Sequence, residues 1–246
     1  MKHFTQTPIG IVGLGDLGTQ LAKQMLAANQ AIIVFDKNQT RVQQFITSLS
    51  ANERARTTLA TSTKAITKQA SFIHFAIPSQ LINFKVFSLG GAEQIFVLHD
   101  SVMGNSLPIA RQHAPQQQIQ IAHWLMNKHN TVLVARDTSP PPELLTHFQK
   151  IGLAPQLIAV KKHDDAMAIS QGLAAHIISS GVLNQLNKLH QDNLLTPSGQ
   201  EFRAFLKNRE SQWTETTISS LITNPQLQRL LNAQPSVAHS SPIAKQ

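Results

Sequence analysis

The stretch Ile9-Gly10-Ile11-Val12-Gly13-Leu14-Gly15-Asp16-Leu17-Gly18 decides the fold of this chain of 246 residues. Its first four residues form a short apolar run, which predicts a buried strand. Leu17, Leu21 and Met25 then recur every four residues and predict a helix with one apolar stripe. A second apolar run, rich in β-branched residues, follows at residues 31–35. The segment therefore predicts a strand, a glycine-rich turn, a helix and another strand.

The glycines of this segment form the pattern Gly-x-Gly-x-x-Gly where the predicted strand meets the predicted helix. Gly13 permits a tight turn, Gly15 leaves room for a pyrophosphate against the backbone, and Gly18 lets the helix pack closely on the strand. The start of the helix adds unpaired N–H groups that bind phosphate. The pattern predicts a dinucleotide site made by Gly13, Leu14, Gly15, Asp16, Leu17 and Gly18.

Asp36 lies at the end of the second predicted strand, 18 residues after Gly18. A carboxylate there can accept hydrogen bonds from the adenosine ribose and repels a 2′-phosphate. We therefore expect NAD as the cofactor, with NADP less favoured, although the adjacent Lys37 reduces this preference. The structural alternatives are a glycine turn that holds no ligand and an Asp36 that serves only as a helix N-cap or a turn carboxylate.

Helix-like and strand-like segments continue to alternate as far as residue 160. A helix is expected at residues 42–49, strands at 71–77, 95–98 and 131–135, a proline-initiated helix at 142–150, and a final turn and strand at 151–160. The segment Met103-Gly104-Asn105-Ser106 is expected to be a loop. This alternation predicts an α/β fold with a parallel, doubly wound sheet of the Rossmann type.

The pattern changes after residue 160, where helices alone are expected. The apolar residues of 164–189 fit one long helix with a broad apolar face, in which Gly172 and Gly181 are expected to permit close helix contacts. Shorter helices are expected at 198–206, 211–222 and 226–231.

Three regions follow from this division: a dinucleotide-binding domain at 1–160, a small helical domain at 161–232, and a polar, disordered tail at 233–246. A helical domain of this size is marginal alone, and its apolar face is wide. We therefore expect it to pack on a second copy and form a homodimer.

The chain has 21 Lys and Arg against 13 Asp and Glu, a formal net charge of +8, yet only 14% of its residues are charged. The basic residues are spread mostly singly from Lys2 to Lys245, without a nucleic-acid motif. This charge favours an adaptation to anionic small molecules, or plain solubility, over a nucleic-acid surface, and we expect no nucleic acid as a partner.

Other classes of site are excluded or unsupported. The absence of cysteine excludes disulfides, cysteine-based zinc sites and thiol nucleophiles. The 11 histidines include no His-Glu-x-x-His, so no metal is expected, and no Gly-x-Ser-x-Gly supports a hydrolase. The N-terminal segment lacks the apolar run of a signal peptide, and no apolar stretch reaches the roughly 20 residues that span a bilayer. We expect a cytoplasmic protein that does not bind membranes.

Across nearly its whole length the sequence resembles the prephenate and arogenate dehydrogenase family, the NAD(P)-dependent enzymes of tyrosine biosynthesis. The resembling segments are the glycine loop, Phe75-Ala76-Ile77-Pro78, Leu98-His99-Asp100-Ser101-Val102, Ile121-Ala122-His123-Trp124-Leu125-Met126 and His163-Asp164-Asp165-Ala166-Met167-Ala168. The last of these is the most particular, because it is similar to the motif that opens the family's helical dimerisation domain.

The resemblance implies roles for single residues. His123 matches the catalytic histidine, which takes the hydroxyl proton of the substrate, and Ser101 matches a serine that bonds the same hydroxyl or positions the histidine. Pro78 corresponds to a position beside the cofactor. Arg209, with Arg203 as the competing candidate, would bind a substrate carboxylate.

His176 lies next to the position of a second family histidine and is a further substrate-binding candidate. His163 with Asp164 is interpreted as a helix-start element. The structural alternatives are a strand-end histidine satisfied by backbone at His123 and a partly buried structural histidine at His176. For Ser101 the alternative is an ordinary capping or turn serine, and for Arg209 a solvated helix arginine.

The sequence departs from the family pattern at Met103, Trp124 and Ala175. Three interpretations of function therefore stay open. The first is an NAD-dependent dehydrogenase that oxidises and decarboxylates a cyclic hydroxy acid such as prephenate or arogenate. The second is a catalytically weakened dinucleotide-binding protein that senses NAD or serves as an interaction subunit. The third is a related two-domain NADPH-dependent reductase of an imine or keto acid.

Overall fold

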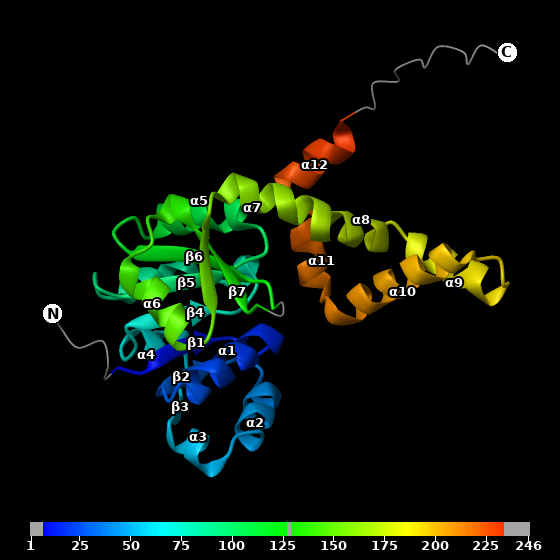
Figure 1. The fold of residues 1–246 in the computed structure, drawn as a ribbon. Coiled ribbons are helices and arrows are strands. Elements are labelled where there is room, and N and C mark those ends of the chain that lie inside the picture. The colour runs from blue at the N-terminus through cyan, green and yellow to red at the C-terminus, as the bar shows by residue number, and fades with distance from the viewer. Residues whose placement is uncertain (1–6, 127–128, 234–246) are drawn as a thin grey trace, which may run out of the picture. The chain divides into compact units, whose positions relative to one another are not determined.

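A computed structural model describes residues 7–126 and 129–233 (Figure 1). The chain divides into two compact units, residues 1–167 and residues 168–246. The domain boundary expected after residue 160 falls at the first residue of helix α7 (Val160–Met167), the last helix of the first unit. Of the expected tail, residues 234–246 lie outside the described residues.

The described part of the first unit is built on one eight-stranded sheet with the order β3-β2-β1-β4-β5-β6-β7-β8. The strands are β1 (Ile9–Val12), β2 (Ile32–Phe35), β3 (Thr57–Leu59), β4 (Phe72–Phe75), β5 (Ile95–His99), β6 (Gln118–Trp124), β7 (Thr131–Ala135) and β8 (Ala154–Ile158). Strands β1 to β6 run parallel. The predicted α/β fold with a parallel, doubly wound sheet is confirmed, with one exception: β7 pairs antiparallel with β6, and β8 pairs parallel with β7. Only a short connection joins β6 to β7, too short for the crossover that a parallel pair needs.

Helices cover both faces of this sheet. They are α1 (Asp16–Ala27), α2 (Gln39–Thr47), α3 (Ala51–Ala55), α4 (Thr63–Thr67), α5 (Met103–His113), α6 (Pro142–Lys150) and α7, with 3-10 turns η1 (Ser79–Leu81), η2 (Phe84–Leu89) and η3 (Arg136–Thr138). Along β5 the side chains alternate: Ile95 and Val97 join a core cluster with α1 and α6, and Phe96 and Leu98 join one with η2 and α5. A strand buried on both faces is mostly apolar, which is why β1 is a continuous apolar run and β4 and β5 are apolar except at His74 and His99.

Two elements of the first unit differ from the sequence expectation. The segment expected as a loop at Met103-Gly104-Asn105-Ser106 is the first turn of α5, and the side chains of Met103 and Ser106 are fully buried. Strand β6 was not expected as a strand, because Gln118 and Gln120 interrupt its apolar pattern. Gln120 is nevertheless buried and accepts a hydrogen bond from the Thr138 hydroxyl at 2.5 Å, so its amide is compatible with the core.

The second unit is helical. Its elements are a π-helical turn (Ala168–Gly172) that continues into α8 (Leu173–Ser179), then α9 (Val182–Gln191), α10 (Pro197–Gln212), α11 (Glu215–Ile222) and α12 (Pro225–Asn232). The single long helix expected over residues 164–189 is wrong at Gly181, which has φ +79° and ends α8 in the left-handed conformation that glycine favours. Gly172 does permit close packing, because a Cβ there would lie 3.1 Å from the Leu227 side chain.

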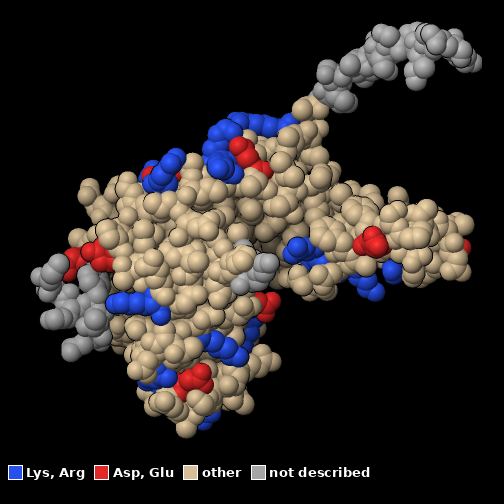
Figure 2. All heavy atoms as spheres, in the orientation of Figure 1, with Lys and Arg blue, Asp and Glu red and all other residues tan. Residues whose placement is uncertain are grey.

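No single helix in residues 7–126 and 129–233 is both long and apolar enough to cross a membrane. The stretch Val160–Ser179 and the helix Val182–Gln191 reach the required length and composition only as a pair, which is bent by 69°. On the face drawn in Figure 2, Lys and Arg side chains lie in small separate groups with Asp and Glu among them.

Candidate functional site

The glycine loop connects the carboxyl end of β1 to the start of α1. Gly13 has φ +99°, and a Cβ on it would lie 2.7 Å from the carbonyl oxygen of Ala76. A Cβ on Gly18 would overlap the carbonyl oxygen of Gly13, so α1 could not pack this closely on the turn. Gly15 has open space where a Cβ would point. These are the geometries that a tight turn, close helix packing and an approaching pyrophosphate require.

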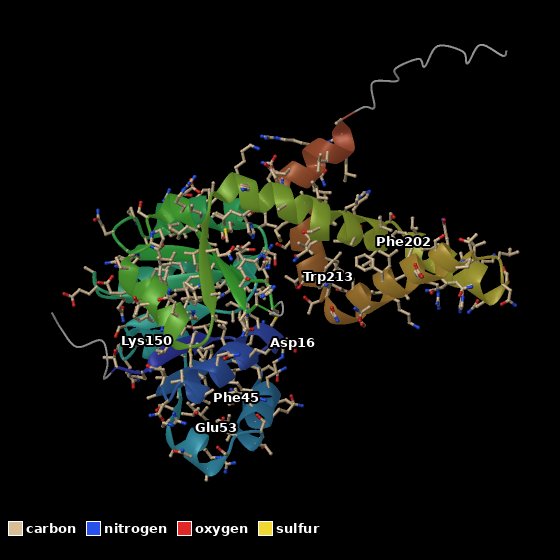
Figure 3. The ribbon with its side chains drawn as sticks, in the orientation of Figure 1. Asp16, Phe45, Glu53, Lys150, Phe202 and Trp213 are labelled. Atoms are coloured by element: carbon tan, nitrogen blue, oxygen red, sulfur yellow. The ribbon has the colours of Figure 1, made fainter. Side chains whose placement is uncertain are left out.

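The start of α1 leaves its first N–H groups without a side-chain cap, because Gly15 occupies the N-cap position. Unpaired N–H groups at the start of a 12-residue helix form an anion site. Leu14 and Leu17 pack into the core, so their contribution to this site is their backbone. The exposed Asp16 lies on the first turn of α1 (Figure 3).

Asp36 ties the glycine loop to the end of β2. Its Oδ2 accepts the N–H of Leu14 at 2.7 Å, its Oδ1 accepts the N–H of Asn38 at 2.8 Å, and the side chain is only 6% exposed. A carboxylate has about four lone-pair positions, so each oxygen retains one for a ribose hydroxyl. The cap of α2 is Asn38 instead, which accepts the N–H groups of Thr40 and Arg41. Asp36 is therefore not the cap of that helix, whereas its bond to the N–H of Asn38, two residues on, is that of a turn carboxylate.

A basic group that sequence reasoning missed lies near this carboxylate. The Arg41 guanidinium Nη1 is 4.0 Å from Asp36 Oδ2. Arg41 follows Asp36 by only five residues, but its guanidinium lies near the carboxylate because the first turn of α2 reverses the chain direction.

Replacing Asp36 with asparagine is expected to weaken NAD binding about 10- to 100-fold, because hydrogen bonds to a charged acceptor contribute about 1.5–3 kcal/mol. The same change is expected to strengthen NADP binding, since the repulsion of a 2′-phosphate is removed beside Arg41. Isothermal titration with both nucleotides measures this. Asp192→Asn, at the exposed end of α9, is the matched control and should change neither dissociation constant. Equal loss of NAD and NADP affinity would contradict the role given to Asp36.

Three further candidates follow the carboxyl ends of neighbouring strands. Pro78 begins η1 after β4, Ser101 lies between β5 and α5, and His123 lies near the end of β6. All three are half-buried. In open α/β sheets, ligands bind outside the carboxyl ends of the strands, where the chain reverses its strand order, and here that point lies between β1 and β4.

His123 is part of a hydrogen-bonded chain that runs into α7 and on to α5. Its Nδ1 lies 2.9 Å from His163 Nε2, and His163 Nδ1 lies 2.8 Å from Asp164 Oδ1. The two oxygens of Asp164 accept the N–H groups of Met103 at 2.9 Å and Gly104 at 2.8 Å, at the start of α5. His163 and Asp164 are buried. The interpretation of these two residues as a helix-start element is wrong: α7 begins at Val160, and Asp164 caps α5.

The His123 side chain is held uncharged at neutral pH. Burial, and then the neighbouring His163 and His99 rings, lower the pKa of His123 from 6.5 to about 3. A neutral imidazole is the form that accepts a proton.

Asp100, next to Ser101, is a buried carboxyl group that sequence reasoning missed. Its Oδ1 accepts the N–H of Val102 at 3.0 Å, whereas its Oδ2 has no hydrogen-bond partner of good geometry within the described residues. Burial raises its pKa above the ordinary value, against the opposing effect of the Val102 hydrogen bond. No local pattern distinguishes such a residue from an ordinary turn aspartate, because its burial depends on the packing of α5.

A second buried histidine chain was also missed. His74 on β4 places Nδ1 2.9 Å from His99 Nε2 and Nε2 3.0 Å from His147 Nε2, and its ring stacks on that of His99. Burial is the main cause that lowers the pKa of His74 well below 6.5, that of His99 to about 3 and that of His147 to about 4.

The candidates of the second unit lie on α8 and α10. Arg209 places its guanidinium 5.5 Å from the Phe205 ring centre and 5.8 Å from that of Trp213, and it forms no ion pair with a described carboxylate. Arg203 donates from Nε to Asn187 at 2.8 Å. Arg209 is therefore the guanidinium group less engaged in hydrogen bonds of the two. His176 is half-buried on α8, and its role stays a prediction.

The departures from the family pattern lie in core positions. Met103 and Ala175 are fully buried, and Trp124 is nearly so. Within residues 7–126 and 129–233, no group of three or more His, Cys, Asp or Glu is arranged to hold a metal ion.

Two surface cavities, of about 500 and 420 Å³, lie at the amino ends of β4, β5 and β6. They are away from the carboxyl edge, where this kind of sheet binds ligands, so we assign them no role.

The fold and the glycine loop define a dinucleotide-binding protein of the Rossmann type with a helical second unit. More particularly, residues 8–91 match the NAD binding domain of 6-phosphogluconate dehydrogenase. Residues 8–91 of the first unit are thus similar to an NAD-binding domain, and the prediction of NAD as cofactor is confirmed.

Solved structures with the same fold include three of interest. A putative prephenate dehydrogenase from Corynebacterium glutamicum superposes with a TM-score of 0.70 at 14% identity, covering 92% of this chain and 78% of that one. Synechocystis arogenate dehydrogenase superposes with a TM-score of 0.61 at 18% identity, and the match covers 91% of this chain and 96% of that one. An imine reductase from Aspergillus terreus in complex with an NADPH-type cofactor superposes with a TM-score of 0.57 at 13% identity. That match covers 85% of this chain and 74% of that one.

No curated protein matches the chain by sequence. At these identities the likeness concerns the fold, and at that level the predicted resemblance to prephenate and arogenate dehydrogenases is confirmed.

Proposed function

We propose that this protein is an NAD-dependent dehydrogenase that oxidises a small carboxylated alcohol, with His123 as the base. The observation that carries the proposal is the His123–His163–Asp164 chain at the carboxyl edge of the sheet that bears the NAD-binding loop. A neutral imidazole on such an edge suits proton transfer, and a nicotinamide cofactor bound in that domain supplies the hydride acceptor.

We assign separate roles in cofactor binding, proton transfer and substrate binding to these residues. The backbone of the glycine loop and the start of α1 bind the pyrophosphate, and Asp36 binds the adenosine ribose. His123 Nε2 takes the hydroxyl proton as hydride leaves the same carbon. Ser101, which follows the neighbouring strand, donates a hydrogen bond to the substrate oxygen.

The proposed substrate class is a cyclic hydroxy acid such as prephenate or arogenate, as the names of the structural neighbours suggest. Hydride leaves the carbinol carbon and the hydroxyl proton moves to His123. Carbon dioxide then leaves the opposite ring carbon, its bonding electrons complete the aromatic ring, and the proton returns to the oxygen to give a phenol. One hydride and one carbon dioxide are lost from each substrate molecule.

Two other functions have observations in their favour. Arg41 beside Asp36 and the imine reductase neighbour favour an NADPH-dependent reductase of an imine or keto acid. Met103, Trp124 and Ala175, which replace family residues, favour a weakened dinucleotide-binding protein.

The deciding experiment follows the absorbance of NADH and NADPH with the purified protein in both directions. Prephenate and arogenate are tested as oxidisable substrates, and a cyclic imine and a keto acid as reducible ones. Melting temperatures with each nucleotide report binding independently, because a ligand that prefers the native state raises the melting temperature. NADH formation with a cyclic hydroxy acid supports the proposal. Binding of NAD without turnover of any of these compounds removes it in favour of the weakened protein.

We further propose that the second unit pairs two copies of the chain. Its helices leave several large apolar side chains exposed, at Ile169, Leu173, Leu194, Phe202, Phe205 and Leu230. A contiguous patch of exposed apolar side chains is typical of protein interfaces, and we propose that these residues contribute to one. Sedimentation is expected to show a dimer that Leu194→Asp weakens. Leu59→Asp, an equally apolar exposed site of the first unit, should leave the dimer intact, and a wild-type monomer at micromolar concentration would refute the pairing.

A further inference from the structure

The carboxylate of Asp164 is the fixed end of the chain that reaches His123. It is 4% exposed, and it accepts two backbone N–H groups, from Met103 and Gly104. Backbone N–H groups only donate, so both oxygens act as acceptors here. His163 Nδ1, 2.8 Å from Asp164 Oδ1, must therefore be the nitrogen that carries a proton.

This arrangement sets the protons of the next ring. In a neutral His163 with its proton on Nδ1, Nε2 is a bare acceptor. His123 Nδ1, 2.9 Å away, then donates to it, which leaves His123 Nε2 with a free lone pair. If both nitrogens of His163 carried a proton instead, His163 Nε2 would donate to His123 Nδ1. A neutral His123 would then carry its own proton on Nε2, which would be a donor.

We propose that Asp164 and His163 are positioning residues that hold His123 with its proton on Nδ1, so that Nε2 is the proton acceptor. The inference rests on the proposed dehydrogenase function, in which His123 is the base.

Gly104, in the first turn of α5, leaves space for the Asp164 carboxylate because it has no Cβ. A Cβ on Gly104 would lie 2.7 Å from Asp164 Oδ2, tighter than any real contact of this kind. Glycine is thus required where the carboxylate meets the helix start. Gly104→Ala therefore displaces the carboxylate without adding or removing a titratable group.

The matched control is Gly91→Ala. Gly91 has open space around its Cβ position and no left-handed backbone, so a methyl group there is tolerated. A loss that appears in Gly104→Ala but not in Gly91→Ala follows from the displaced carboxylate rather than from an added methyl group.

The first measurement is the side-chain 15N spectrum of the full-length protein at neutral pH, with His123→Asn to assign the His123 signals. Wild type and Gly91→Ala are expected to carry the His123 proton on Nδ1, and Gly104→Ala and Asp164→Asn to lose that single tautomer. A wild-type His123 with its proton on Nε2, or a tautomer unchanged in both variants, overturns the inference.

The second measurement is turnover. Gly104→Ala and Asp164→Asn are expected to lower kcat about 10- to 100-fold, part of what a positioned base contributes, while the Kd for NAD stays unchanged. Unchanged kcat in both variants would overturn the inference. If the wild type turns over no substrate, the proposed function fails, and the tautomer spectrum alone decides the positioning role.

Discussion

Replacing His123 with alanine is expected to lower kcat about 10²–10⁴-fold, the usual contribution of a positioned general base. The Kd for NAD should change less than about twofold, because the glycine loop and Asp36 bind the nucleotide. His123 lies on β6, which is separated by β4 and β5 from β1, the strand that carries that loop. The measurement pairs steady-state NADH formation with calorimetric titration of NAD.

Exogenous imidazole should restore part of the lost rate, since alanine leaves the space of the ring beside His163 Nε2. His190→Ala, at an exposed position of α9, is the control for the removal of a histidine and should keep full activity. A His123→Ala variant that retains a third or more of the wild-type kcat would exclude His123 as the base.

The cofactor half of the site was predictable because its signals are local. Gly13, Gly15 and Gly18 lie within six residues, and each glycine has a steric reason that depends only on the turn they form. Asp36 ends the next strand, and parallel neighbours place their carboxyl ends at one edge. Geometry that depends only on residues close in sequence can be predicted from the sequence.

The chain around His123 was not predictable, because its members come from distant segments. His123 and His163 are 40 residues apart, and Gly104 lies 60 residues before Asp164. The adjacent pair His163-Asp164 indicated only a helix start, and nothing near Gly104 indicated that its missing Cβ makes room for a carboxylate. Such contacts appear only when α5 and α7 pack on each other.

Two errors in secondary structure have a similar cause. Gly181 was interpreted as a packing glycine within one helix, although a glycine that ends a helix has the same neighbours in sequence. The backbone conformation distinguishes the two roles, and Gly181 has a left-handed backbone. The expected loop at Met103 is helical, since Asp164 supplies from 60 residues away the cap that the local sequence lacks.

The first unit is expected to lose stability steeply below pH 6.5. His74, His99, His123 and His147 all have a lowered pKa when folded, so the unfolded chain binds more protons than the folded one below the ordinary value of 6.5. Stability therefore rises with pH in this range and is lost as pH falls towards the folded values. Each group contributes up to about 1.4 kcal/mol per pH unit, and four together up to about 5.

Asp100 opposes this loss. Its pKa is raised on folding, so below that raised value the folded state binds the extra proton and gains stability as pH falls. The four histidines outnumber this one carboxyl group, so the net effect is a loss of stability as pH falls. Against a typical total of about 5–15 kcal/mol, the first unit should unfold near pH 4–5.

Denaturant titrations between pH 7.5 and 5 test this, with the fluorescence of Trp124 as the probe. Trp124 is buried in the core of the first unit, and the other tryptophan, Trp213, is replaced by phenylalanine so that only the first unit reports. His74→Phe is expected to be less stable at neutral pH, because His99 and His147 lose their shared partner. It should also reduce the pH slope by about 1.4 kcal/mol per unit, whereas the exposed His190→Gln should leave the slope unchanged. A wild-type stability that does not vary over this range would mean that the buried histidines are protonated without unfolding, and the neutral state assigned to His123 would then be wrong as well.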